Sequence, residues 1–269
     1  MLLGYEFKES AKIIDTHCHL DDEAYFDDLN EVLAHSFENN IDKIIIPAAD
    51  TKDLPRAVEL SENYEQIYFA VGLHPNVAQN YDESLLRAFI THQKCVGVGE
   101  CGLDYHYIKA DDTAEKARQK QVFIAQLELA AEFKKPVIIH CREATQDTYE
   151  LVNAYKSELV GGAFHCFNAS EMLLNLASAN FYYGIGGVLT FKNAKNLINI
   201  LSKIPKERLL LETDAPYLSP EPLRGKRNEP LLTHFVATKM AEILAVQRDE
   251  LIDICTQNSQ RLFFQKEKR

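Results

Sequence analysis

The sequence predicts an α/β fold, a (β/α)8 or TIM barrel, and three observations lead to this prediction. Eight short runs rich in β-branched residues alternate with longer segments of helical apolar spacing, the pattern of parallel strands joined by crossover helices. Several of the short runs are apolar throughout, which is typical of strands covered on both faces. The length of 269 residues is close to that of one such barrel.

The expected strands leave room for a helix between each pair. They cover residues 12–15, 43–47, 67–71, 96–100, 137–140, 161–164, 181–184 and 209–213. The expected helices cover residues 27–39, 53–64, 84–91, 113–134, 144–157, 170–178 and 193–204. The clearest is 113–134, where Val122, Phe123, Leu129 and Phe133 form one apolar stripe. An open, doubly wound sheet is the alternative, but no Gly-rich dinucleotide-binding turn supports it.

Two further helices are expected after the last strand, over residues 230–244 and 249–255, with Pro230 early in the first turn. No linker of Ser, Gly or Pro, no low-complexity segment and no internal repeat interrupts the pattern. We therefore expect a single domain over residues 1–269, with residues 1–11 as an N-terminal extension and 265–269 as a frayed tail.

The composition restricts the class of protein. A net charge of -11 argues against a broad basic surface that holds nucleic acid by charge alone, although local positive charge, including bound metal, remains compatible. No apolar run approaches the roughly 20 residues of a membrane span. Glu6, Lys8 and Glu9 stand where a signal peptide needs an apolar core. The six cysteines form no CxxC pair, so we expect packed, reduced thiols and a cytoplasmic location. We also expect a monomer without an obligate protein partner.

The first expected strand runs directly into His17 and His19. Residues i and i+2 of an extended chain point to the same face, so both imidazoles can reach one point past the strand end. Such a pair suits a divalent metal held by neutral ring nitrogens. Taken alone, the pair is equally compatible with two surface histidines, so the metal interpretation needs further ligands.

Other expected strands also end in residues that can bind metal. Glu100, His140, His165 and Asp214 each follow an apolar run, and the carboxyl ends of barrel strands converge on one mouth. Individually, Glu100 or Asp214 could cap a following segment, and each histidine could be a hydrogen-bonded core residue. Their joint occurrence with His17 and His19 predicts a metal site.

The order of these motifs resembles the TatD family of metal-dependent deoxyribonucleases, within the amidohydrolase-like barrels. The resemblance covers nearly the whole chain and shows no departure at a ligand position. It rests on HCH at 17–19, GLHP at 72–75, GECGLDY at 99–105, HCR at 140–142, FHCF at 164–167, ETDAPYL at 212–218 and RGKRNEP at 224–230.

The resemblance implies a barrel of the metal-dependent hydrolase type with a two-metal site. One divalent ion is expected on His17, His19, Glu100 and Asp214, and a second on His140, His165 and the bridging Glu100. Mg, Mn and Zn all remain open for this mixed donor set. Glu100 and Asp214 are the expected catalytic residues, with a metal-activated water as nucleophile and Asp214 orienting that water and accepting its proton.

Other residues near the expected mouth are candidates for substrate binding. Arg142 can contact a phosphate, His74 and Tyr105 can line the mouth, and Tyr105 can stack on a base. Arg224 and Arg227, together with Lys226, form a compact basic cluster that can contact phosphates. The alternatives are a salt bridge for Arg142 and ordinary loop packing for His74 and Tyr105. The basic cluster could instead be a solvated charge run, or it could hold the C-terminal helices in place.

The resulting functional prediction is a metal-dependent phosphodiester hydrolase. The resemblance implies a deoxyribonuclease that removes nucleotides from the 3′ end of DNA, with RNA as a further substrate to consider. One alternative is hydrolysis of an ester or amide, such as an aminoacyl-tRNA bond, because metals polarise carbonyls as well as phosphates. The other is a catalytically silent barrel that binds nucleic acid or a protein partner.

Overall fold

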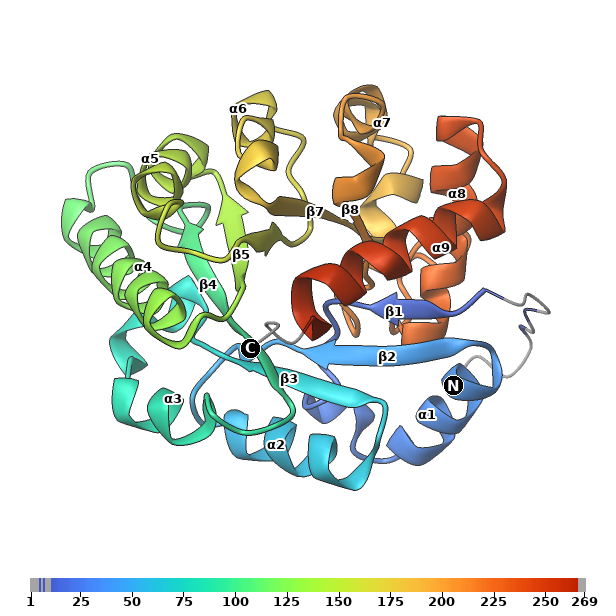
Figure 1. The fold of residues 1–269 in the computed structure, drawn as a ribbon, viewed down its shortest axis with the longest axis horizontal. Coiled ribbons are helices and arrows are strands. Elements are labelled where there is room, and N and C mark those ends of the chain that lie inside the picture. The colour runs from blue at the N-terminus through green and yellow to red at the C-terminus, as the bar shows by residue number, and fades with distance from the viewer. Residues whose placement is uncertain (1–4, 6, 8–10, 266–269) are drawn as a thin grey trace.

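A computed structural model describes residues 5, 7 and 11–265, in which eight parallel strands follow one another in chain order around a barrel (Figure 1). This confirms the predicted TIM barrel and excludes the open doubly wound sheet. The strands are β1 Ile13–Asp15, β2 Ile41–Ile46, β3 Ile67–Val71, β4 Cys95–Asp104, β5 Val137–Arg142, β6 Gly162–Phe164, β7 Phe181–Ile185 and β8 Leu209–Leu211.

The barrel is nearly closed by contacts between the end of β8 and the end of β1. The backbone N–H of Thr16 donates to the carbonyl of Leu211 at 3.1 Å, and Cys18 forms a parallel bridge with Ala215. The N–H of Asp214 also donates to the carbonyl of His17 at 2.8 Å. The contacts that close the sheet therefore join the segments that carry three of the predicted metal ligands.

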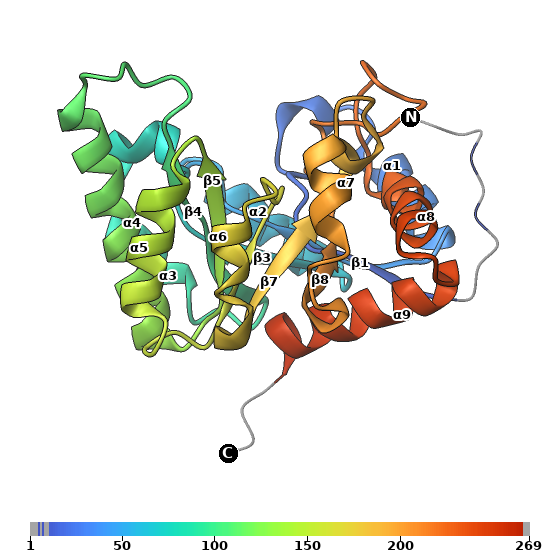
Figure 2. The same cartoon turned by 90° about the horizontal axis from the view of Figure 1, so that it is seen from above.

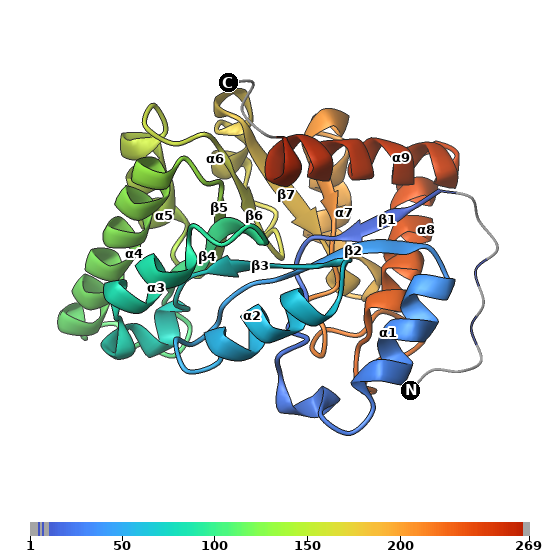
Figure 3. The same ribbon diagram turned by 60° about the horizontal axis from the view of Figure 1, so that its bottom comes forward.

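Helices cover the outside of the sheet (Figure 3). The α-helices are α1 Leu29–Glu38, α2 Leu54–Asn63, α3 Glu83–Phe89, α4 Thr113–Phe133, α5 Thr145–Tyr155, α6 Glu171–Leu174, α7 Lys195–Leu201, α8 Thr233–Leu244 and α9 Arg248–Ser259. Short 3-10 helices lie at Glu23–Tyr25, Pro75–Asn80, Ala177–Ala179, Gly187–Thr190, Lys206–Arg208 and Pro230–Leu232. Within residues 11–265, no helix combines the length and the apolar character that crossing a membrane requires.

The two ends of the barrel differ. We call the end where the strands begin the lower end and the end where they finish the upper end. Towards the lower end, the interior is filled by seven buried side chains, one from each of β2 to β8. These side chains pack with Leu262 and Phe263 of the π-helical segment Gln260–Phe264. Those side chains are Ile45, Ala70, Val96, Ile138, Ala163, Tyr182 and Leu210. The loops that follow the strands rise on the side opposite to α9 (Figure 2). The C-terminal segment therefore covers the lower end, and the upper end is left for a site.

Element boundaries differ from the predictions at a few places. The expected single helix over residues 170–178 is wrong: α6 ends at Leu174, and a separate 3-10 turn covers Ala177–Ala179. Apolar spacing alone cannot separate one continuous helix from two tight turns. The expected strand 96–100 continues to Asp104, and the strand 209–213 ends at Leu211. The proposed extension 1–11 and tail 265–269 fall mostly outside the described residues, so the single-domain prediction stays a prediction.

Candidate metal centre

Glu100 lies inside β4 rather than at its end, at an irregularity in the pairing with β5. The register shifts between Val98 and Cys101, and the Glu100 N–H donates to the carbonyl of Ala48 in the loop after β2, at 3.0 Å. Gly99 has a φ of +151°, and a Cβ there would lie 2.5 Å from the Ile138 carbonyl oxygen, so a side chain does not fit. Bulges of this kind re-aim side chains near active sites, which is how a carboxylate in mid-strand reaches the mouth.

The two carboxylate oxygens of Glu100 face two different groups of histidines. Oε1 lies 2.7 Å from Nε2 of His165 and 2.8 Å from Nδ1 of His140. Oε2 lies 3.2 Å from Nε2 of His17 and 3.6 Å from Nε2 of His19. Glu100 is 2% exposed, so the carboxylate sits within a buried ring of imidazoles. This division of the two oxygens is the geometry that a bridging ligand needs.

Asp214 meets the two histidines of the first motif. Its Oδ1 lies 3.6 Å from Nε2 of His17 and 3.5 Å from Nε2 of His19. The buried carboxylate of Asp15 accepts hydrogen bonds from the Thr213 N–H at 3.0 Å, from the Thr213 hydroxyl at 2.6 Å and from the His17 N–H at 3.2 Å. Asp15 therefore fixes the ends of β1 and β8 against each other, and with them the positions of His17 and Asp214.

The proton affinities follow from burial and from these contacts. Burial would raise the pKa of Glu100, but the surrounding imidazoles, first those of His165 and His17, outweigh burial and hold it well below its usual range. Burial lowers the pKa of His17 to about 4. For His19, burial is outweighed by the hydrogen bond with Asp214 and the charge of Glu100, which raise its pKa to about 9. The centre therefore combines an ionised carboxylate with imidazoles of very different basicity.

The donor set fits divalent metal ions. Both ring nitrogens of the buried His17 and Nδ1 of His165 have no hydrogen-bond partner among the described residues, an arrangement that is costly unless a lone pair is used otherwise. Three groups of residues place one ligand atom each within 4.8 Å of one another. They are His17, His165 and Asp214; His17, His19 and Glu100; and His74, Glu100 and His140. Imidazole nitrogens with carboxylate oxygens suit Zn and Mn, and the carboxylates also suit Mg.

His140 is oriented by a residue that the sequence analysis did not single out. Its Nε2 lies 3.2 Å from Oδ2 of Asp104, which is 1% exposed, while its Nδ1 faces Glu100. Both ring nitrogens of His140 thus face carboxylates, which only accept hydrogen bonds. If Nδ1 binds a metal ion, the ring proton would stay on Nε2, where Asp104 accepts it and fixes the orientation of the ring. Asp104 could have been found: it lies four residues beyond Glu100 on an extended strand and so points to the same face.

His74 reaches the same centre with the opposite arrangement of protons. Its Nδ1 accepts a hydrogen bond from the backbone N–H of Asn76 at 3.1 Å, so a neutral His74 carries its proton on Nε2. That Nε2 lies 3.5 Å from Oε1 of Glu100 and 3.3 Å from Nδ1 of His140. The structure thus brings His74 together with the six predicted ligands, as a hydrogen-bond donor directed into the centre.

The remaining predicted contacts lie further out. Arg142 is exposed, and its guanidinium carbon lies 5.3 Å from the ring centre of Tyr107. The Tyr105 hydroxyl donates to Asp147 at 2.7 Å, and Lys116 lies 5.3 Å from its ring centre. These contacts hold the half-buried Tyr105 in the loop that follows β4.

The basic cluster divides into two parts. The guanidinium carbon of Arg224 lies 3.6 Å from the ring centre of Phe191, and Arg224 is exposed. In Arg227, Nη1 donates to the Ala24 carbonyl and to Asp28, and Nη2 donates to Asp28 and Glu229 at 2.8 and 3.0 Å. Both terminal nitrogens thereby use their two N–H groups. Arg227 thus has Asp and Glu partners as the bracing alternative expected, but they join its loop to the segment before α1 and do not lie in the C-terminal helices. Its contact with phosphate stays a prediction.

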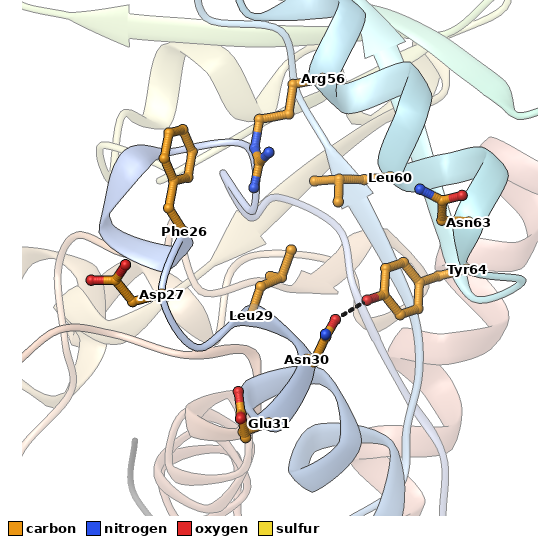
Figure 4. A pocket seen from close by; sticks show the side chains of 9 residues that line it. All are labelled: Phe26, Asp27, Leu29, Asn30, Glu31, Arg56, Leu60, Asn63 and Tyr64. Carbon is orange, nitrogen blue, oxygen red and sulfur yellow. Dashed lines mark hydrogen bonds between the residues drawn. The ribbon is translucent and has the colours of Figure 1, made fainter.

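A surface pocket of about 290 Å³ lies away from this centre (Figure 4). It is formed by α1, α2 and the segment before α1, and it contains none of the predicted site residues. Its lining is Phe26, Asp27, Leu29, Asn30, Glu31, Arg56, Leu60, Asn63 and Tyr64. The guanidinium carbon of Arg56 lies 4.2 Å from the ring centre of Phe26. The candidate centre is therefore identified by its converging side chains and not by the size of a pocket.

Comparison with known proteins assigns the family. Residues 14–264 match the model of the TatD-related DNase family. The chain is 41% identical over 255 residues to an uncharacterised metal-dependent hydrolase, YabD, of Bacillus subtilis, covering 93% of this chain and 98% of that protein. It is 32% identical over 261 residues to the 3′-5′ ssDNA/RNA exonuclease TatD of Edwardsiella piscicida, covering 93% and 99%.

Solved structures agree with the sequence comparisons. A TatD homologue of Escherichia coli, YJJV, superposes with a TM-score of 0.86 at 29% identity, covering 94% of this chain and 98% of that one. A TatD-family hydrolase of Entamoeba histolytica gives a TM-score of 0.83 at 25% identity, covering 97% and 99%. With eight parallel strands, a matching family model and clusters of His, Glu and Asp at the barrel mouth, the chain belongs to the TatD family of metal-dependent hydrolases.

Proposed function

We propose that this hydrolase is a deoxyribonuclease that removes nucleotides from the 3′ end of single-stranded DNA, with RNA as a second substrate. The observation that carries the proposal is that the two carboxylate oxygens of Glu100 face two different groups of histidines. A carboxylate in this position can bridge two divalent ions, and such a pair suits phosphodiester hydrolysis. The polarity and the single-strand preference are taken from the printed activity of the Edwardsiella relative.

The residues of the centre have distinct roles in this proposal. His17, His19 and Asp214 would hold one ion, His140 and His165 the other, and Glu100 both. When bound, such ions polarise a phosphodiester and lower the pKa of water, whichever of Mg, Mn or Zn is native. Asp214 orients the attacking water and accepts its proton.

His74 and the loop cations act on the substrate. The Nε2–H of His74 points into the centre, where it can donate to a phosphate oxygen. Arg142 and Arg224 are exposed and can contact neighbouring phosphates, while Tyr105 and Arg227 hold the loops that present them. The six free thiols are compatible with our proposal of a cytoplasmic protein, and we propose that it acts as a monomer.

The proposed activity can be tested directly on purified protein. We expect 3′-to-5′ shortening of a single-stranded DNA oligonucleotide in the presence of Mg, Mn or Zn, and loss of shortening with excess chelator. Glu100→Gln should abolish the activity, whereas Arg142→Ala should mainly raise KM. If all three metals leave the oligonucleotide intact and an aminoacyl ester is hydrolysed instead, the acyl-hydrolase alternative replaces this proposal.

The role of Asp104 predicts a loss of metal affinity. Asp104→Ala frees the His140 ring to rotate, so we expect metal affinity to fall by about 10- to 100-fold in a calorimetric titration of the apoprotein. Asp104→Asn should retain part of the affinity, because its amide oxygen can still accept from Nε2. Asp147→Ala removes a carboxylate from the same mouth and serves as control. Wild-type affinity in Asp104→Ala would exclude the positioning role.

The basic loop predicts two separable effects. Replacing Arg224 and Lys226 together by Ala should raise KM for oligonucleotides and flatten its dependence on salt, with unchanged stability, because fewer counterions are released on binding. Arg227→Ala should instead lower the free energy of unfolding by about 1–3 kcal/mol in urea, because it leaves Asp28 and Glu229 without these charged hydrogen bonds. A double variant with an unaltered salt dependence would remove the loop from the proposed DNA path.

A further inference from the structure

Aromatic side chains remain exposed around the barrel mouth. Among the described residues, five large hydrophobic side chains are exposed, and the three aromatic ones are Phe26, Tyr107 and Tyr217. Each lies on a loop that follows a strand: β1 for Phe26, β4 for Tyr107 and β8 for Tyr217. These loops rise together on the side opposite to α9 (Figure 2). Tyr107 and Tyr217 lie on loops at the same end of the barrel as the metal centre, where an exposed ring can stack on a flat ligand.

Tyr217 stands directly beside the metal centre. Its ring centre lies 6.0 Å from that of His19, and the residue is 53% exposed. Its hydroxyl donates to Asp22 at 2.8 Å, its N–H donates to the Asp214 carbonyl at 2.9 Å, and its carbonyl accepts from the Asn228 amide at 2.7 Å. The ring is therefore fixed at both ends while part of its surface stays open, so little conformational entropy is lost when a ligand stacks on it.

Tyr107 stands on the other side of the mouth. In an eight-stranded barrel whose strands follow chain order, the loops after β4 and β8 lie four strands apart and face each other across the centre. Tyr107 is 73% exposed, and Arg142, which follows the predicted ligand His140 by two residues, lies 5.3 Å from its ring centre. Tyr107 thus offers the open face that the half-buried Tyr105 lacks, next to a cation that suits a phosphate or a base.

We propose that Tyr217 and Tyr107 are stacking platforms on opposite sides of the metal centre, on which unpaired bases of a single-stranded nucleic acid rest while a phosphodiester lies over Glu100. This inference rests on the proposed nuclease function and explains its strand preference by this chain's own residues. Bases in a duplex are stacked on each other and cannot lie on an isolated side chain, whereas every unpaired base has a free face. Stacking of this kind gives strand selectivity with little sequence preference.

Phe26 provides the matched comparison. It is exposed at the same end of the barrel, but it belongs to the outer pocket with Arg56, Leu60 and Tyr64 (Figure 4). Its ring is paired with the Arg56 guanidinium, and Phe26 belongs neither to the predicted ligands nor to the proposed platforms. Removing this ring therefore removes an exposed aromatic group from the mouth loops without touching the proposed platforms.

The test uses metal-loaded protein and a phosphorothioate-linked single strand that carries 2-aminopurine as its 3′-terminal base. Stacking on a ring changes the fluorescence of this base, and a phosphorothioate strand resists cleavage, so binding and stacking are measured without turnover. We expect quenching with wild type, Tyr217→Phe and Phe26→Leu. Tyr217→Leu should lose the quenching, and Tyr217→Leu and Tyr107→Leu should each raise Kd roughly tenfold.

The outcomes separate this inference from the nuclease proposal. If wild type shortens a normal single strand, but Tyr217→Leu and Tyr107→Leu bind and quench as wild type does, the stacking assignment is overturned and the nuclease proposal stands. An equal loss in Phe26→Leu also overturns it, because the effect then belongs to the mouth loops in general. A wild type that neither binds nor shortens single strands overturns both.

Discussion

The buried carboxylate of Glu100 is the group on which the rest of the site depends. An ionised carboxylate that is 2% exposed carries a large desolvation cost unless positive charge or strong donors surround it. Here His17 and His19 approach one oxygen, and His140 and His165 approach the other. The imidazoles hold the pKa of Glu100 low, and Nε2 of His17, which faces Oε2 of Glu100, has no hydrogen-bond partner among the described residues. Divalent cations between Glu100 and the histidines would compensate the carboxylate charge and bind the lone pairs of the imidazole nitrogens.

The fold serves this group in two ways. The irregular pairing of β4, with Gly99 in a conformation that excludes a side chain, turns Glu100 into the mouth from the middle of a strand. The closure of β8 onto β1, fixed by the buried Asp15, then brings His17 and Asp214 to the same point. The C-terminal segment fills the lower end of the barrel, which leaves the upper loops to shape substrate access.

The sequence was sufficient to predict the barrel and the convergence of the six predicted ligands. The apolar runs indicated the strands, and the His, Glu or Asp residues that follow them indicated the side chains at the barrel mouth. The sequence could not place Glu100 in mid-strand, since a bulge depends on how β4 pairs with its neighbours. The sequence analysis overlooked Asp104, although its spacing from Glu100 could have indicated it. The proton arrangement of His74 emerges only from side-chain contacts. Arg227 was indistinguishable from Arg224 in sequence, and only the fold brings Asp28 and Glu229 around it.

The central claim is that one carboxylate, Glu100, bridges two metal ions. Anomalous diffraction from crystals of the wild-type protein grown with Mn tests it most directly. The account predicts two anomalous peaks per chain, one beside His17 and His19 at Oε2 of Glu100 and one beside His140 and His165 at Oε1. A single peak at saturating Mn, or two peaks of which only one contacts Glu100, would contradict the bridging role on which the proposed hydrolysis is built.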